Sequence, residues 1–128
     1  MDLELFSKEM AREDVPKDVD WKKIDKCIHL SIDKRVEKGL PWGHKNLINV
    51  SSELAELNVA LTKYMLGERS INLLEEIADV TCALRYLSII VGIHEEELAK
   101  AINVKMQREI KRIATTDEER KLLLYPME

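Results

Sequence analysis

Two long segments of the chain carry apolar side chains at intervals of three and four residues, and this spacing most constrains the fold. In residues 45–66 and again in residues 70–91, such intervals place the apolar side chains on one stripe of a helix. The stripes consist of Leu47, Val50, Leu54, Leu57, Leu61 and Met65, and of Leu73, Ile77, Val80, Leu84, Leu87 and Val91. Gly67 and Gly92 follow the stripes, as is typical of helix C-caps. Because few residues separate the segments, we predict two antiparallel neighbouring helices.

Weaker apolar patterns predict further helices on both sides of this pair. One is expected over residues 21–38 and another over residues 94–113. Thr116–Glu119 is typical of a capping box that opens a short final helix. We therefore predict an all-α protein, an antiparallel bundle of about four main helices. Its parts are an N-terminal segment (1–20), a helical domain (21–113), and a short C-terminal helix and tail (114–128).

The composition excludes several classes of protein. A chain of 128 residues fits one domain, and only 5% aromatic residues with 4 Gly and 3 Pro disfavour a β-sandwich or barrel. A net charge of −4 argues against nucleic-acid binding. No apolar stretch reaches the ~18 residues of a membrane span, and the acidic start has no secretory apolar region. Cys27 and Cys82 form no CxxC motif, which predicts reduced thiols in a cytoplasmic protein.

Four carboxylates in two short phrases accompany the apolar stripes. Glu53 and Glu56 lie three residues apart in the first segment, and Glu76 and Asp79 lie three residues apart in the second. Residues at this spacing project from one face of a helix. On a helical wheel both pairs fall at the edge of the apolar stripe. Two antiparallel helices can bring these edges face to face, so we expect all four acids in one group.

Such a group needs a cation, because gathered carboxylates repel one another. Oxygen ligands without neighbouring His or Cys favour Mg²⁺, or Mn²⁺, over Zn²⁺ or copper. A ferritin-like di-iron centre would need Glu-x-x-His pairs, and none of the three histidines follows a Glu at that spacing. The competing interpretation is a solvated acidic face, because the chain has 24 acidic residues.

Carboxylate-bound Mg²⁺ is typical of enzymes that act on phosphate esters, so positive side chains should exist elsewhere. The predicted helix over 94–113 offers Asn103, Lys105 and Arg108 within six residues. The simpler interpretation of this phrase is a charged amphipathic helix, since Lys111 and Arg112 follow.

These phrases together resemble the MazG-type all-α nucleoside triphosphate pyrophosphohydrolases, which are related to the dimeric dUTPases. Glu53-x-x-Glu56 and Glu76-x-x-Asp79 are similar to the family signature ExxE–x(12–28)–ExxD, and residues 57–75 form the interval. The phrase Asn103-x-Lys105-x-x-Arg108 is similar to a downstream family motif. Trp42-Gly43 resembles small, phage-type relatives.

The resemblance implies Mg²⁺-dependent cleavage of an NTP or dNTP between the α- and β-phosphates, which yields a nucleoside monophosphate and pyrophosphate. It assigns the metal and catalytic roles to the two acid pairs, Glu53/Glu56 and Glu76/Asp79. The triphosphate would be bound by Asn103, Lys105 and Arg108, and the nucleobase would be covered by Trp42 and His44. The family often has an acid where this chain has Ser52, so the number of metal ions and the general base stay open.

One further expectation and two alternatives accompany this resemblance. The long apolar stripes predict a homodimer or homotetramer, because one small subunit offers too little partner surface to cover them. Within the same fold, the substrate could instead be dUTP or phosphoribosyl-ATP. From a different class, the chain could be a non-catalytic helical assembly or regulatory module whose acids only solvate the bundle.

Overall fold

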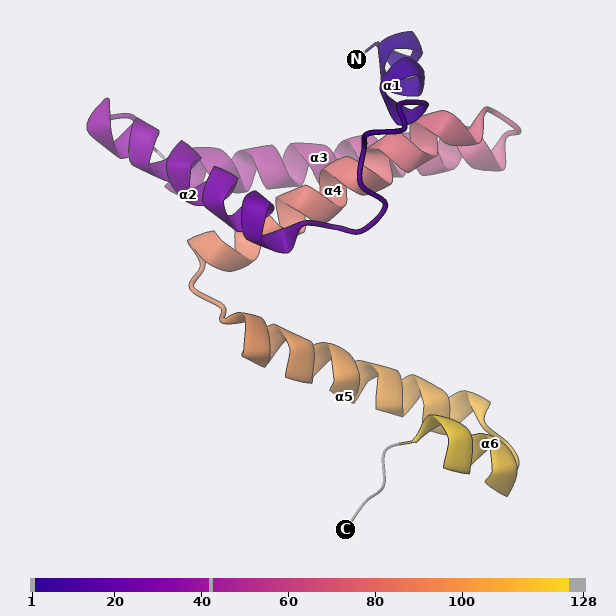
Figure 1. The fold of residues 1–128 in the computed structure, drawn as a ribbon. Helices are drawn as coiled ribbons and strands as arrows, with labels where there is room; N and C mark the ends of the chain where they lie inside the picture. Colours follow the sequence, from indigo (N-terminus) through magenta and orange to yellow (C-terminus); the bar gives the residue numbers. More distant parts are fainter. Residues whose placement is uncertain (1, 42, 125–128) are drawn as a thin grey trace. The chain divides into compact units, whose positions relative to one another are not determined.

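The computed structural model describes residues 2–41 and 43–124, without the side chains of His44 and Lys45. In these ranges it contains helices and no strand, which confirms the all-α class. The helices are α1 (Leu3–Met10), α2 (Trp21–Glu37), α3 (Gly43–Met65), α4 (Ser70–Ile90), α5 (Glu95–Ile113) and α6 (Asp117–Leu123) (Figure 1). The chain divides between Val91 and Gly92 into two compact units, one with α1–α4 and one with α5 and α6.

Helices α3 and α4 pack along each other and form the centre of the first unit, as the stripes predict (Figure 1). The side of α3 that is buried or half-buried follows a heptad-like line through Asn46, Val50, Glu53, Leu57 and Ala60. This line has the spacing of a coiled-coil seam, but it contains an amide and a carboxylate. The acid pair of α3 is therefore tied to the helix–helix contact through Glu53.

The turn between α3 and α4 is built on Gly67. This residue has φ +95°, a left-handed conformation that costs little only for glycine. The amide of Gly67 donates to the carbonyl of Tyr64 at 3.0 Å, and the amide of Glu68 donates to the carbonyl of Lys63 at 3.1 Å. These two bonds are those of a Schellman motif. They confirm the predicted C-cap and turn the chain back within a short loop, residues 66–69.

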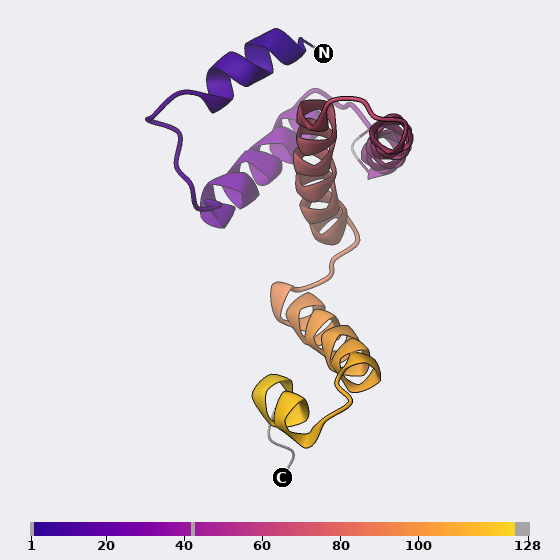
Figure 2. The same cartoon turned by 90° about the vertical axis from the view of Figure 1, so that its right-hand side faces the viewer.

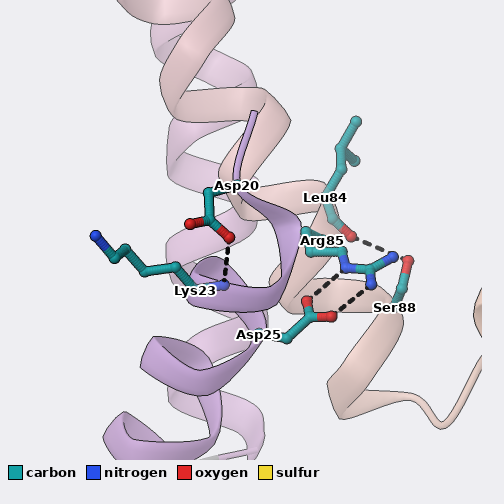
Figure 3. Close-up of polar contacts among 6 residues, drawn as sticks. All are labelled: Asp20, Lys23, Asp25, Leu84, Arg85 and Ser88. Carbon is teal, nitrogen blue, oxygen red and sulfur yellow. Dashed lines mark hydrogen bonds and ion pairs between the residues drawn. The ribbon is translucent and has the colours of Figure 1, made fainter. Parts of the chain in front are cut away.

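A polar contact ties α2 to α4. The Arg85 guanidinium donates from Nε and Nη2 to the two carboxylate oxygens of Asp25, both at 2.7 Å (Figure 3). Arg85 also lies over the ring of Trp21, 5.5 Å from its centre, within the range of a cation–π contact. Asp20 caps the start of α2 by accepting from the Lys23 amide at 3.0 Å (Figure 3). The ion pair, the ring contact and the cap together hold the first turns of α2 in place.

The second unit consists of α5 and the short α6, which folds back and contacts it (Figure 1 and Figure 2). Ala114, just after α5, is 1% exposed, and its carbonyl accepts from Arg120 Nε at 3.2 Å. The Thr116 hydroxyl accepts from the Glu119 amide at 3.1 Å. This contact confirms the cap predicted for the final helix.

Much of the predicted apolar stripe is uncovered in a single chain. Three heptad-spaced residues of α3 and two of α4 are 39–47% exposed; they are Leu47, Leu54, Leu61, Ile77 and Leu84. Each of these helices carries an apolar band wider than one neighbouring helix covers. We call these five residues the exposed leucine stripe. Among the described residues, no helix is long and apolar enough to cross a membrane.

Candidate metal centre and adjoining pocket

Three of the four predicted carboxylates come together where α3 faces α4. One oxygen each from Glu53, Glu76 and Asp79 lies within 4.8 Å of the other two. Glu53 comes from the contact line of α3, and the i,i+3 pair Glu76 and Asp79 comes from the adjoining face of α4. Opposite ligands of an octahedral Mg²⁺ are about 4 Å apart, since each metal–oxygen distance is about 2.1 Å. The group is therefore close to the size that such an ion requires.

The oxygens of this group lack partners within the protein. Glu53 Oε2, Glu76 Oε2 and Asp79 Oδ2 are each shielded from solvent without a hydrogen-bond donor in the described part of the chain. Leaving a buried polar atom unpaired costs about 1–3 kcal/mol, and more when the atom carries charge. A buried carboxylate that serves only the fold would be expected to accept a hydrogen bond from a nearby donor. Three carboxylates that lie close together, each with a buried oxygen that lacks a donor, instead fit a site for a hard cation.

Burial and mutual repulsion disfavour the charged state of all three acids. The pKa of Glu53 is raised by burial and then by the charges of Glu56, Asp79 and Glu76. The pKa of Glu76 is likewise raised by burial, and then by Glu56 and Asp79. Burial raises the pKa of Asp79, with a further contribution from Glu56. A bound cation would reverse this effect, because it stabilises the ionised carboxylates.

Glu56 lies beside the group but outside it. Its side chain is exposed, and it is absent from the three-carboxylate cluster, although its charge acts on every member. The i,i+3 spacing from Glu53 placed it on the same side of α3. It reaches solvent because Glu53 lies on the contact line and Glu56 lies farther around the helix. The described geometry thus contains three close carboxylates where the sequence led us to expect four.

Glu75 is a buried acid of α4 next to the carboxylate group in sequence. Only 2% of its surface is exposed, and neither carboxylate oxygen has a hydrogen-bond partner among the described residues. Its charge contributes to the raised pKa of Glu76. On α4 it points about 100° away from Glu76, so it does not belong to the converging group.

A pocket of about 460 Å³ opens next to the carboxylates, between α2, α3 and α4. Glu53 and Asp79 form part of its wall, so the candidate metal centre and the pocket are continuous. Its apolar wall comes from three helices and comprises Ile24, Ile28, Val50 and Ala83. The volume falls within the usual range for small-molecule sites, about 300–1,000 Å³.

Polar groups also line this pocket. The Tyr86 hydroxyl donates to Ser31 Oγ at 3.3 Å and joins the α4 wall to the α2 wall. Asn46 and Asn49 come from the first turns of α3, and the free thiols of Cys27 and Cys82 also line the pocket. Sequence reasoning missed most of these residues. The one signal in the sequence was a polar Asn46 in register with Val50, Leu57 and Ala60, which are apolar.

The predicted phosphate-binding residues belong to the second compact unit. Asn103, Lys105 and Arg108 all lie on α5. Asn103 and Arg108 line one hollow along this helix, together with Lys100, Gln107 and Lys111, and Lys105 is not part of its lining. A single helical face therefore offers three cations. The candidate nucleobase residue Trp42 and the side chain of His44 lie outside the described residues.

No protein-family model, no curated protein and no solved structure matches this chain.

Proposed function

We propose that the protein is a Mg²⁺-dependent nucleoside triphosphate pyrophosphohydrolase of the MazG type, which converts an NTP or dNTP to the monophosphate and pyrophosphate. The observation that supports this most is a group of three close carboxylates, each with one buried and unpartnered oxygen, beside a pocket large enough for an organic ligand. A solvated acidic face would place its oxygens in water, whereas these are buried. The acid spacing and the Asn103–Arg108 phrase support the same activity through resemblance.

In this proposal Glu53, Glu76 and Asp79 hold the metal ion, with Mn²⁺ as an alternative to Mg²⁺. When bound, the ion would neutralise phosphate charge and acidify a water molecule. Glu56 is exposed beside the group and would orient the attacking water and accept its proton. Lys105 and Arg108 would contact the triphosphate as a point charge and a fork, and Asn103 would help to position it.

We further propose that the bundle is completed by a second or further copies of the chain. The exposed leucine stripe supports this, because apolar side chains repeated at heptad spacing are typical of helix–helix interfaces. Trp42 and His44 keep their proposed roles at the nucleobase.

The decisive experiment is incubation of the protein with a panel of NTPs and dNTPs, including dUTP, and with phosphoribosyl-ATP, in millimolar Mg²⁺, with detection of pyrophosphate. We expect release from at least one substrate and loss of release in Asp79→Asn. No pyrophosphate from any member of the panel would refute the activity.

A Mg²⁺ titration of the melting temperature separates this proposal from the alternative of a non-catalytic helical module. A site that binds the ion only in the folded state stabilises that state by mass action. The wild-type melting temperature should therefore rise with Mg²⁺, and that of Asp79→Asn should rise less. A module with a merely solvated acidic face would show equal and small responses in both proteins.

A further inference from the structure

The pocket beside the carboxylates is a slot with different chemistry at its two ends. Along α3 the lining runs from Asn46 through Val50 to Glu53, a rise of about 10 Å at 1.5 Å per residue. Along antiparallel α4 it runs from Tyr86 through Ala83 to Asp79, over the same distance. The acids thus occupy one end, and an amide with a hydroxyl occupies the other.

This layout matches a nucleotide, whose phosphates and heterocyclic base are joined through a sugar. The phosphates belong at the acidic end, where a cation can bind. The middle of the slot carries the apolar side chains of Val50, Ala83 and Ile28, from three different helices, beside Asn49 and Cys82. Such walls suit the faces of a planar ring, and a ring seated there presents its hydrogen-bonding edge toward the far end.

Asn46 is a buried polar group at that end with unused hydrogen-bonding capacity. It is 5% exposed, lines the slot, and its amide nitrogen has no partner among the described residues. The Tyr86 hydroxyl, by contrast, already donates to Ser31. The terminal torsion of Asn is broad and nearly two-fold, so a small rotation can present either the donor or the acceptor.

We propose that Asn46 is the residue that recognises the nucleobase and sets base selectivity in the slot between α2, α3 and α4. The inference rests on the proposed nucleotide hydrolysis and deepens it. A carboxamide sets one donor beside one acceptor, and this pair complements a base edge that also combines both. A base with a mismatched edge would leave buried polar groups without hydrogen bonds, which strongly disfavours its binding. One amide can therefore discriminate among bases.

Two substitutions test this role. Asn46→Leu keeps a similar volume and removes both hydrogen bonds, so the ratio of kcat/KM between the best and the worst base should collapse toward one. Asn46→Asp leaves only acceptors, which suit the adjacent N1–H and N2–H donors of guanine and oppose the acceptor atoms of adenine, cytosine and uracil. In this variant, kcat/KM for guanine relative to the other bases should rise by about tenfold, as expected for one good bidentate pair.

The same changes at Asn58 provide the matched control, because Asn58 is an exposed amide on α3 that does not line the slot. Neither Asn58 variant should alter relative kcat/KM, and circular dichroism checks that all variants fold. If the Asn46 variants change kcat/KM by the same factor for every substrate, or change it for none, the inference is overturned. The hydrolase proposal would remain intact.

Free nucleosides without metal separate the two proposals. If the wild type cleaves no triphosphate, the hydrolase proposal fails, and ligand-observed NMR with adenosine, cytidine, uridine and guanosine still tests the slot. Binding of any of them that disappears in Asn46→Leu and persists in Asn58→Leu supports base recognition. Absence of binding by an inactive wild type, or binding that Asn46→Leu does not alter, refutes it.

Discussion

Asp79 combines two opposing demands within one side chain. It lines a pocket large enough for a small organic molecule. Its carboxylate lies close to two other acids, and one of its oxygens is buried without a hydrogen-bond donor. Such a residue is costly in the metal-free protein, and in the proposed function it acts as a ligand of the cation. Function and stability should therefore respond in opposite directions when one acid of the group is neutralised.

We expect the metal-free protein to become more stable as the pH falls from neutral toward the ordinary carboxyl range near pH 4. Burial and neighbouring charges raise the pKa of Glu53, Glu76 and Asp79 in the folded state, so the folded protein binds protons more tightly than the unfolded chain does. Their contribution is destabilising above the folded pKa values and disappears below about pH 4, the ordinary carboxyl value. Urea unfolding across this pH range measures the effect.

Asp79→Asn and millimolar Mg²⁺ serve as the two controls. The variant should raise the urea midpoint at pH 7 without metal and flatten its pH dependence, and Mg²⁺ should flatten it in the wild type. Asp25 behaves in the opposite sense, because its hydrogen bond to Arg85 lowers its pKa and its contribution is lost only at more acidic pH. An identical pH profile in wild type and variant would contradict the prediction.

At the level of elements, α2 is the wall of the pocket with the fewest supports. Its sequence-distant hydrogen bonds include the paired contacts of Asp25 with Arg85 (Figure 3). They also include the longer bond between Ser31 and Tyr86, at 3.3 Å. Side-chain exposure at the ion pair is only 14% for Arg85 and 31% for Asp25. A partly desolvated, bidentate pair contributes more than an exposed one.

Asp25→Asn should therefore destabilise the protein by about 1–3 kcal/mol, between the values typical of exposed and buried pairs. Part of the loss comes from leaving the Arg85 charge undercompensated. The matched control is Asp14→Asn, which breaks the exposed pair with Arg12 and should change the urea midpoint little. Equal losses of stability in the two variants would show that the ion pair between α2 and α4 stabilises the protein no more than an exposed pair does.

The glycine in the α3–α4 turn gives a second test at this scale. Gly67→Ala should lower stability by about 1–2 kcal/mol, because φ +95° is unfavourable for residues with a Cβ even where nothing crowds it. Gly43→Ala provides the control: Gly43 lies in α3 without positive φ, and a Cβ there meets open space. It should be neutral or slightly stabilising. Thermal unfolding followed by circular dichroism measures both.

The helices from α2 to α6 could be predicted from sequence to within about two residues, whereas α1 (Leu3–Met10) lies in the N-terminal segment for which no helix was predicted. The apolar spacing, the C-cap at Gly67 and the N-cap at Thr116 indicate where helices begin and end. These signals are local properties of the sequence. The position of Glu56 could not be predicted, because it depends on which line of α3 faces α4. The burial of Glu75 and the Asn46 end of the slot depend on three helices meeting in space, which no local pattern encodes.

For the whole molecule, the main unexplained surface is the exposed leucine stripe. We expect the protein to be an oligomer through this stripe, and Leu54→Glu with Leu61→Glu to reduce its mass in solution toward that of a monomer. Burying a charged carboxylate in an apolar interface is strongly unfavourable. Val59→Glu is the control, since Val59 is 56% exposed on α3 and outside the stripe. Light scattering coupled to size exclusion gives the mass; a monomeric wild type would contradict the expectation.

The short turn at Gly67 also bears on the order of folding. The converging carboxylates all lie within residues 53–79, in one hairpin closed by the loop 66–69. Closing so short a loop costs little entropy, and contacts between residues close in sequence form early. A cation that binds these acids can thus engage the chain before α1 or α2 has docked. We expect Mg²⁺ to accelerate refolding, rather than only to slow unfolding, so that the ion assists in assembling the centre that it later occupies.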